Sequence, residues 1–89
     1  MISRRTPRFT KAFEALPTDV QELARAAFQQ FKQDPAHPSL RFKQVHTTAA
    51  IYAVRVGLHH RALAVREGDV LLWFWVGSHS DYDKLLKRL

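Results

Sequence analysis

Three short apolar segments follow one another in the second half of the chain, and they constrain the fold more than any other feature. They span residues 51–56, 61–67 and 70–76. A tight turn at Gly68 separates the last two, and a short loop that begins at Gly57 separates the first two. Apolar segments of this length with such short connections predict consecutive antiparallel strands.

The first half of the chain shows helical periodicity. Residues 18–33 carry its strongest apolar stripe, which consists of Val20, Leu23, Ala24, Ala27, Phe28 and Phe31. This spacing predicts an amphipathic helix with one buried face. Thr18 and Gln21 fit a T-x-x-Q capping box at its start, and Asp34-Pro35 ends it.

A shorter helix is predicted before it. Thr6-Pro7 supplies a hydroxyl at the N-cap and a proline at the first helical position, and Leu16-Pro17 closes the helix. Residues 2–5 are compatible with a short edge strand. Residues 35–41 form a proline-punctuated loop, and residues 42–45 a further strand.

The end of the chain predicts a buried strand followed by a helix. Alternation places Trp73 and Trp75 on one face of the strand 70–76 and Phe74 on the other, so both faces are apolar. Ser80 is the expected cap of the terminal helix, whose apolar stripe is Tyr82, Leu85, Leu86 and Leu89. The sequence therefore predicts a single α+β domain over residues 1–89. A helical hairpin packs on a small, mostly antiparallel four-stranded sheet with a short C-terminal helix.

The charge balance indicates an anionic partner. The chain has 14 lysines and arginines against 8 acidic residues, a formal net charge of +6. Such an excess in a small domain favours nucleic acid, a membrane surface or an acidic protein, although a basic surface without function is the alternative. Cysteine is absent, which excludes disulfides. No secretory h-region or membrane-length apolar run is present, so we expect a soluble cytoplasmic protein that does not bind membranes.

Candidate site residues cluster in the strands and at the exit of the last one. Histidine is the residue type suited to proton exchange at neutral pH, and His79 lies beside a helix N-terminus, where amides attract phosphate. Arg55 and Arg61 are suited to clamping a phosphate. The alternatives are a histidine that only caps the strand–helix corner and ordinary surface arginines. Arg55 and Arg61 share a face only if the hairpin register permits it. Arg66 lies on the face opposite Arg61.

Four other residues are weaker candidates for RNA contacts. They are Lys43, Arg66, His60 at the hairpin tip, and Tyr82, for which core packing is the more common role. Asp81 and Asp83 suit the dipole at the start of a helix. The histidines lack the spacing of metal ligands, so we expect no metal site and no cofactor.

Several motifs, taken together, resemble the RelE/ParE toxin superfamily of bacterial type II toxin–antitoxin pairs. The resemblance covers nearly the whole chain. Its motifs are F-x-K-A-F-x-x-L-P-x-x-V-Q from Phe9, D-P-x-H-P-S-L-R-F-K from Asp34, Y-x-V-R-V-G from Tyr52, R-A-L-x-V-R from Arg61 and W-x-G-S-H-x-D-Y-D-x-L-L from Trp75.

This resemblance implies one of two activities. RelE-like members cleave mRNA, usually on the ribosome and without a metal, whereas ParE-like members poison DNA gyrase. An antitoxin protein holds both kinds inactive. The G-S-H-S-D segment is most similar to the YafQ-type ribonucleases, whose matching histidine is catalytic, and this match carries over onto His79 alone. Lys43 matches a basic strand residue of the RNA-cleaving members.

The combined expectation is a toxin that acts as a metal-independent endoribonuclease on mRNA, through attack of the 2′-OH on the adjacent phosphate. His79 would be the general acid/base, and Arg55 and Arg61 would hold the phosphate. An acidic antitoxin would cover the basic groove. The alternatives are a gyrase inhibitor, a catalytically silent protein that binds an antitoxin, and a module that acts only in antitoxin-mediated promoter binding.

Overall fold

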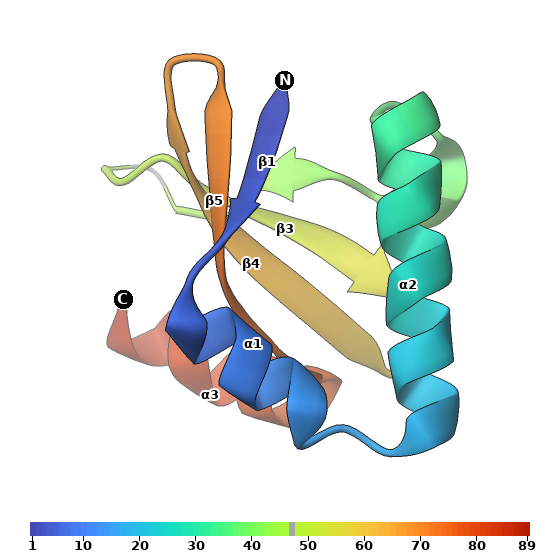
Figure 1. Cartoon of the computed structure of the whole chain (residues 1–89). Coiled ribbons are helices and arrows are strands. Elements are labelled where there is room, and N and C mark those ends of the chain that lie inside the picture. Colours follow the sequence, from blue (N-terminus) through green and yellow to red (C-terminus); the bar gives the residue numbers. More distant parts are fainter. Residues whose placement is uncertain (47) are drawn as a thin grey trace.

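The computed structural model describes residues 1–46 and 48–89. Its elements along the chain are β1 (Ile2–Arg5), α1 (Pro7–Glu14), α2 (Thr18–Gln33), a 3-10 turn (Pro38–Leu40), β2 (Lys43–Gln44), β3 (Ile51–Val56), β4 (His60–Glu67), β5 (Val70–Ser78) and α3 (His79–Arg88). The strands form one sheet in the order β1-β5-β4-β3-β2 (Figure 1). β1 runs parallel to β5, and all other neighbours are antiparallel. The α+β prediction is confirmed.

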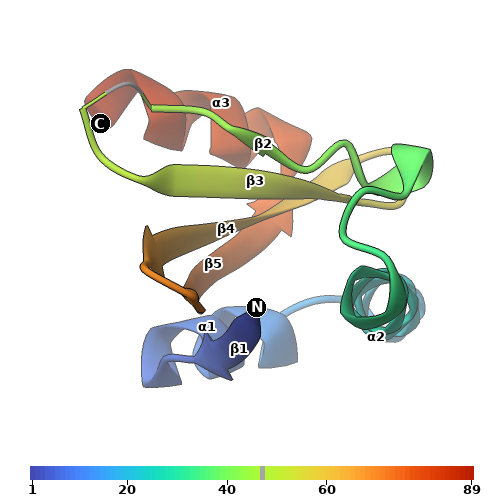
Figure 2. The same cartoon turned by 90° about the horizontal axis from the view of Figure 1, so that it is seen from above.

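The sheet separates two apolar clusters. In Figure 2, α1 and α2 lie on one side of the sheet and α3 lies on the other. The first cluster fills the space under α1 and α2, and includes Phe9, Phe31, Val54, Val56 and Trp73. The second lies under α3 and includes Ile51, Ala53, Leu63 and Tyr82. We call these two sides of the sheet the hairpin face and the α3 face.

The sheet has five strands within the described residues rather than the four predicted. The additional strand is β1, which the sequence indicated only as compatible with an edge strand. The backbone N–H of Ile2 donates to the carbonyl of Asp69, and that of Thr6 donates to the carbonyl of Trp73. These bonds fix the amino-terminal segment against β5.

Of the two predicted helix caps, that of α1 is confirmed and that of α2 is wrong. Thr6 caps α1, because its Oγ1 accepts from the N–H of Phe9. The capping box of α2 is wrong: Pro17 occupies the N-cap position, and no side chain caps the helix. Gln21 instead donates through Nε2 to the carbonyls of Phe13, Glu14 and Leu16. It therefore satisfies the orphan carbonyls at the end of α1 and ties the two helices together.

The sequence predicts that Trp73 and Trp75 share one face of β5, but a β-bulge in this strand places them on opposite faces. Leu63 pairs with Trp75 and Ala64 with Trp73, so Phe74 is the extra residue. A bulge reverses the alternation of side chains beyond it. Trp73 consequently packs in the hairpin-face cluster, whereas Phe74 and Trp75 both pack on the α3 face.

The terminal helix begins earlier than predicted. Ser78, not Ser80, is the N-cap, since its Oγ accepts from the N–H of Asp81. His79 is thus the first residue of α3. Among the described residues, no helix is long and apolar enough to cross a membrane.

Candidate functional site

Arg55 and Arg61 are directly opposite each other on β3 and β4. Cross-strand partners share a face of the sheet. Their neighbours two positions away, Ala53 and Leu63, belong to the cluster under α3. The register that the sequence left open therefore places both arginines on the α3 face.

Each of these guanidiniums is held by a backbone carbonyl at the β3–β4 hairpin. Arg55 Nε donates to the Gly57 carbonyl at 3.1 Å, and Arg61 Nη1 donates to the His60 carbonyl at 2.8 Å. Neither arginine forms an ion pair with a carboxylate in the part of the chain that the structure describes. Both cations are therefore oriented by neutral groups and keep donors for an anion.

A third arginine adds to this positive charge. Arg41 follows the 3-10 turn and adopts a left-handed backbone with φ of 47°, a conformation that non-glycine residues rarely take. Burial, the charge of Arg55 and the charge of Arg41 lower the pKa of Arg61, whereas Tyr82 and the carboxylate of Asp83 raise it. The balance is a lowered pKa, so repulsion between the crowded cations and burial outweigh the nearby counter-charge, and a bound anion would relieve them. We call Arg41, Arg55 and Arg61 the guanidinium cluster.

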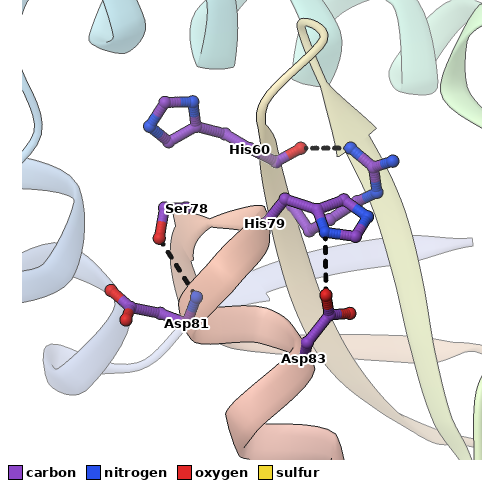
Figure 3. Close-up of polar contacts among 6 residues, drawn as sticks. His60, Ser78, His79, Asp81 and Asp83 are labelled. Carbon is purple, nitrogen blue, oxygen red and sulfur yellow. Dashed lines mark hydrogen bonds and ion pairs between the residues drawn. The ribbon is translucent and has the colours of Figure 1, made fainter.

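His79 lies at the adjoining edge of this site. Its backbone N–H donates to the His59 carbonyl at 2.7 Å, which ties the start of α3 to the β3–β4 hairpin. Its Nδ1 lies 3.2 Å from Asp83 Oδ2, one helical turn along α3 (Figure 3). The side chain of His79 is 45% exposed, so solvent and substrate can reach the ring.

The start of α3 offers fewer free amides than the sequence suggested. The N–H of His79 is occupied by the His59 carbonyl, and the N–H of Asp81 is occupied by Ser78 Oγ. A phosphate at this corner would therefore depend mainly on side chains. The guanidinium cluster is the natural source of that charge.

Tyr82 links the histidine to the arginines, but from a buried position. It is 7% exposed and belongs to the α3-face cluster. Its ring centroid is 5.6 Å from that of His79. Burial and the nearby carboxylate of Asp83 raise its pKa, against the opposing charge of Arg61. The phenol therefore stays protonated at neutral pH.

Trp75 forms a further side of the site. Gly77 lies directly opposite Arg61 on β5, so no side chain separates the arginine from β5 there. The Trp75 indole crosses this gap, because a Cβ built on Gly77 would meet Trp75 Cζ2 at 2.5 Å. An aromatic ring is thus placed on the strand next to Arg61.

The other predicted contact residues divide between the two faces. Lys43 is exposed and pairs with Ala53, which places it on the α3 face. Arg66 lies on the hairpin face, where its guanidinium carbon is 5.8 Å from the Tyr52 ring centroid. His60 pairs with Val56 of the hairpin-face cluster, and Figure 3 shows its ring pointing away from His79. Arg66 and the His60 ring therefore lie apart from the guanidinium cluster.

Sequence reasoning missed three residues of this site. Arg41 carried no signal, because its proximity to Arg61 arises from the path of the loop. Asp83 was assigned to the helix dipole alone, although its spacing from His79 is that of an i, i+4 pair. Trp75 was expected to share a face with Trp73, because the bulge was unforeseen. Among the described residues, no group of three or more potential metal ligands is present.

Comparisons with known proteins agree with this architecture. The family model described as "ParE-like toxin domain" matches residues 18–84. No curated protein sequence matches the chain. YafQ from E. coli superposes with a TM-score of 0.71 at 7% identity, covering 90% of this chain and 94% of that one. The toxin in the RelB–RelE antitoxin–toxin complex of Methanococcus jannaschii gives 0.70 at 18% identity, covering 90% and 95%.

The isolated RelE toxin of E. coli is a further structural match, with a TM-score of 0.65 at 15% identity over 98% of this chain and 96% of that one. At such low sequence identities, the structural matches establish the fold alone. The family model, in contrast, covers most of the chain, including all three residues of the guanidinium cluster. The chain therefore belongs to the ParE-like toxin domains of the RelE/ParE toxin superfamily.

Proposed function

We propose that this protein is the toxin of a toxin–antitoxin pair and acts as an endoribonuclease on mRNA, in association with the ribosome. The main support is the guanidinium cluster, in which Arg55 and Arg61 oppose each other on the α3 face and the charge of Arg41 acts on Arg61, with no ion-pairing carboxylate among the described residues. An accessible imidazole adjoins it. Binding of a polyanion requires only the arginines, whereas cleavage also requires the imidazole of His79.

In the proposed reaction, the 2′-OH of one nucleotide attacks the phosphorus of the adjacent phosphate. His79 accepts the hydroxyl proton as general base. The bond from phosphorus to the 5′ oxygen breaks, and that oxygen takes a proton from solvent. The products are a 2′,3′-cyclic phosphate and a 5′-hydroxyl. Arg55 and Arg61 stabilise the charge that develops on the phosphoryl oxygens, and no metal is required for this role.

Asp83 positions the histidine in this scheme. Its carboxylate lies against Nδ1, so the proton on the neutral ring stays on Nδ1 and Nε2 is left as the atom that accepts a proton. Tyr82 packs beside His79. The exposed Lys43 lies on the same face of the sheet, on the edge strand β2, and would contact the flanking phosphates.

The test compares wild-type protein with His79→Ala after induction in a bacterium. Transcript ends are mapped and growth is followed. We expect new ends and growth arrest with wild type, and neither with His79→Ala. His59→Ala is the matched control, because it removes an exposed histidine side chain from the adjoining hairpin and leaves the backbone carbonyl. Growth arrest by His79→Ala with unchanged new ends would remove the histidine from the mechanism.

A second candidate function is inhibition of DNA gyrase. It is favoured by the match to the ParE-like toxin domain, and it requires no titrating side chain. The same induction experiment distinguishes it. A DNA damage response with intact transcripts, unaffected by His79→Ala, would favour gyrase.

The proposed protein partner is an acidic antitoxin. The formal charge of +6 favours it, and two of the structural matches are toxins in complexes with RelB antitoxins. A partly disordered acidic chain that folds on binding would neutralise this surface. Purification of the toxin with the product of a neighbouring gene would test this pairing.

A further inference from the structure

The indole of Trp75 is half-buried and takes no part in the chemistry of the proposed reaction. The bulge at Phe74 moves Trp75 to the α3 face, which also carries Arg55 and Arg61. Trp73 stays on the hairpin face, where it is only 1% exposed. The two tryptophans of the chain therefore lie in different environments. One belongs to the core, and the other is open on the side of the sheet where the opposed arginines lie.

The two tryptophans also differ in their aromatic neighbours. Phe28 and Phe31 pack edge-on against Trp73, with ring centroids at 5.0 and 5.6 Å. Within residues 1–46 and 48–89, no aromatic ring pairs with Trp75 and no cation lies over its ring. A planar aromatic ligand is the complementary group for such a ring.

Gly77 allows the Trp75 indole to lie beside Arg61. Gly77 and Arg61 are partners across β5 and β4, and the β-carbon positions of such partners are about 5 Å apart on one face of the sheet. A Cβ built on Gly77 would lie 2.5 Å from Trp75 Cζ2 and 2.9 Å from Trp75 Cη2. The six-membered ring of the indole therefore occupies the place next to Arg61. A nucleobase is joined to its phosphate through a single sugar, so a phosphate held by Arg61 brings its base within reach of this ring.

We propose that Trp75 is a stacking platform for the nucleobase next to the phosphate that Arg55 and Arg61 hold. This inference rests on the proposed function and adds a binding residue to the same site. Every nucleobase has a π-face, so the platform accepts any base and leaves sequence preference to other contacts. The nucleotide is then held at two points, its base and its phosphate. Such anchoring restricts the sugar between them and aligns the 2′-OH for attack.

The test uses single-stranded RNA that is methylated on every 2′-oxygen and so cannot be cleaved by attack of the 2′-OH. Binding is followed by tryptophan fluorescence, which a stacked nucleobase quenches. We expect quenching in wild type and none in Trp75→Phe, whose remaining tryptophan is buried on the other face. Trp75→Leu weakens binding at least about tenfold. The matched control is Tyr52→Leu, which removes a half-buried aromatic ring from the hairpin face and leaves the affinity within about twofold.

An abasic version of the same strand separates stacking from effects on folding. It keeps the phosphates and lacks the bases, so wild type binds it at least about tenfold more weakly than the complete strand. In Trp75→Leu the two strands differ by less than about threefold, because the platform is absent. Circular dichroism identifies any variant that does not fold. If Trp75→Leu is such a variant, the quenching in wild type and its loss in Trp75→Phe decide the matter.

Four outcomes overturn the proposal: absence of RNA binding, binding without quenching, equal weakening by Trp75→Leu and Tyr52→Leu, and equal affinity of wild type for the complete and the abasic strand. Cleavage of unmethylated mRNA is measured separately, with ribosomes present. Quenching without cleavage would refute the proposed function and leave the platform intact. Cleavage without quenching would refute the platform and leave the proposed function intact.

Discussion

The opposed pair Arg55 and Arg61 makes a measurable prediction about stability. The chain offers an unusually well matched control, because Arg55 and Arg66 each donate through Nε to the carbonyl of a glycine two residues further on, both at 3.1 Å. Only Arg55 faces another arginine across the sheet, since Arg66 pairs with Leu71. The two substitutions Arg55→Gln and Arg66→Gln therefore remove the same charge and the same kind of bond. Only the first removes a like-charge contact, and only the second removes a contact with an aromatic ring, that of Tyr52.

The expected magnitudes follow from these contacts. Loss of either hydrogen bond costs about 1 kcal/mol, independently of salt. Like charges directly opposite each other on neighbouring strands destabilise by about 0.5 kcal/mol, within a range of roughly 0.2–1. This repulsion is effective at about 0.01 M salt and screened at about 1 M, where the Debye length is about 3 Å. Arg55→Gln should thus cost about 0.5 kcal/mol at low salt and about 1 kcal/mol at high salt.

Urea unfolding of wild type and both variants at the two salt concentrations measures these differences. Arg66→Gln should cost about 1.5–2 kcal/mol at both, because it loses the hydrogen bond and the contact with the Tyr52 ring. RNA cleavage by Arg55→Gln should fall about a hundredfold, whereas Arg66→Gln should retain it. The reasoning is refuted if the two variants show the same salt dependence, because the arginines then do not repel each other as their register requires.

Three further predictions concern local structure. Ser78→Ala should lower the free energy of unfolding by about 1 kcal/mol through loss of the α3 cap, and Ser80→Ala should change it by less than about 0.5 kcal/mol; thermal unfolding of both variants checks this. Gly77→Ala should cost about 1–3 kcal/mol, since the added methyl overlaps the Trp75 ring, and the near-ultraviolet circular dichroism of tryptophan should change with it. The raised pKa of Tyr82 means that the folded state holds the phenol proton more tightly than the unfolded chain. Its contribution to stability is therefore complete below pH 10.0 and is lost as the pH rises beyond that value. Between neutral and alkaline pH, the free energy of unfolding measured in urea should fall less in Tyr82→Phe than in wild type.

Features that depend on local sequence were predicted well. The hairpin at Gly68 follows from two apolar segments and a residue with positive φ, here +59°. The start of α1 follows from the hydroxyl of Thr6 and the fixed φ of Pro7. The strand Ile51–Val56 agrees with its predicted bounds. In each case the decisive interactions lie within a few residues, so the sequence contains them.

Features that depend on contacts between distant elements were not predicted. The bulge at Phe74 results from packing on both faces of β5, which alternation along one strand cannot reveal. Gln21 fits a cap within its own helix, yet it bonds to α1 because the hairpin brings those carbonyls close. The candidate site shows the same division. His79 could be named as a candidate from its residue type and position, whereas the proximity of Arg41 to Arg61 depends on how the loop before β2 folds against the sheet.

The chemistry of the RNA ends tests the central claim most directly. The proposed attack by the 2′-OH leaves a 2′,3′-cyclic phosphate, so RNA from induced cells is ligated selectively at such ends and sequenced. The account predicts new cyclic-phosphate ends within coding regions for the wild-type chain, and their absence for His79→Ala. New ends that carry a 3′-hydroxyl, or growth arrest without any new ends, would contradict it.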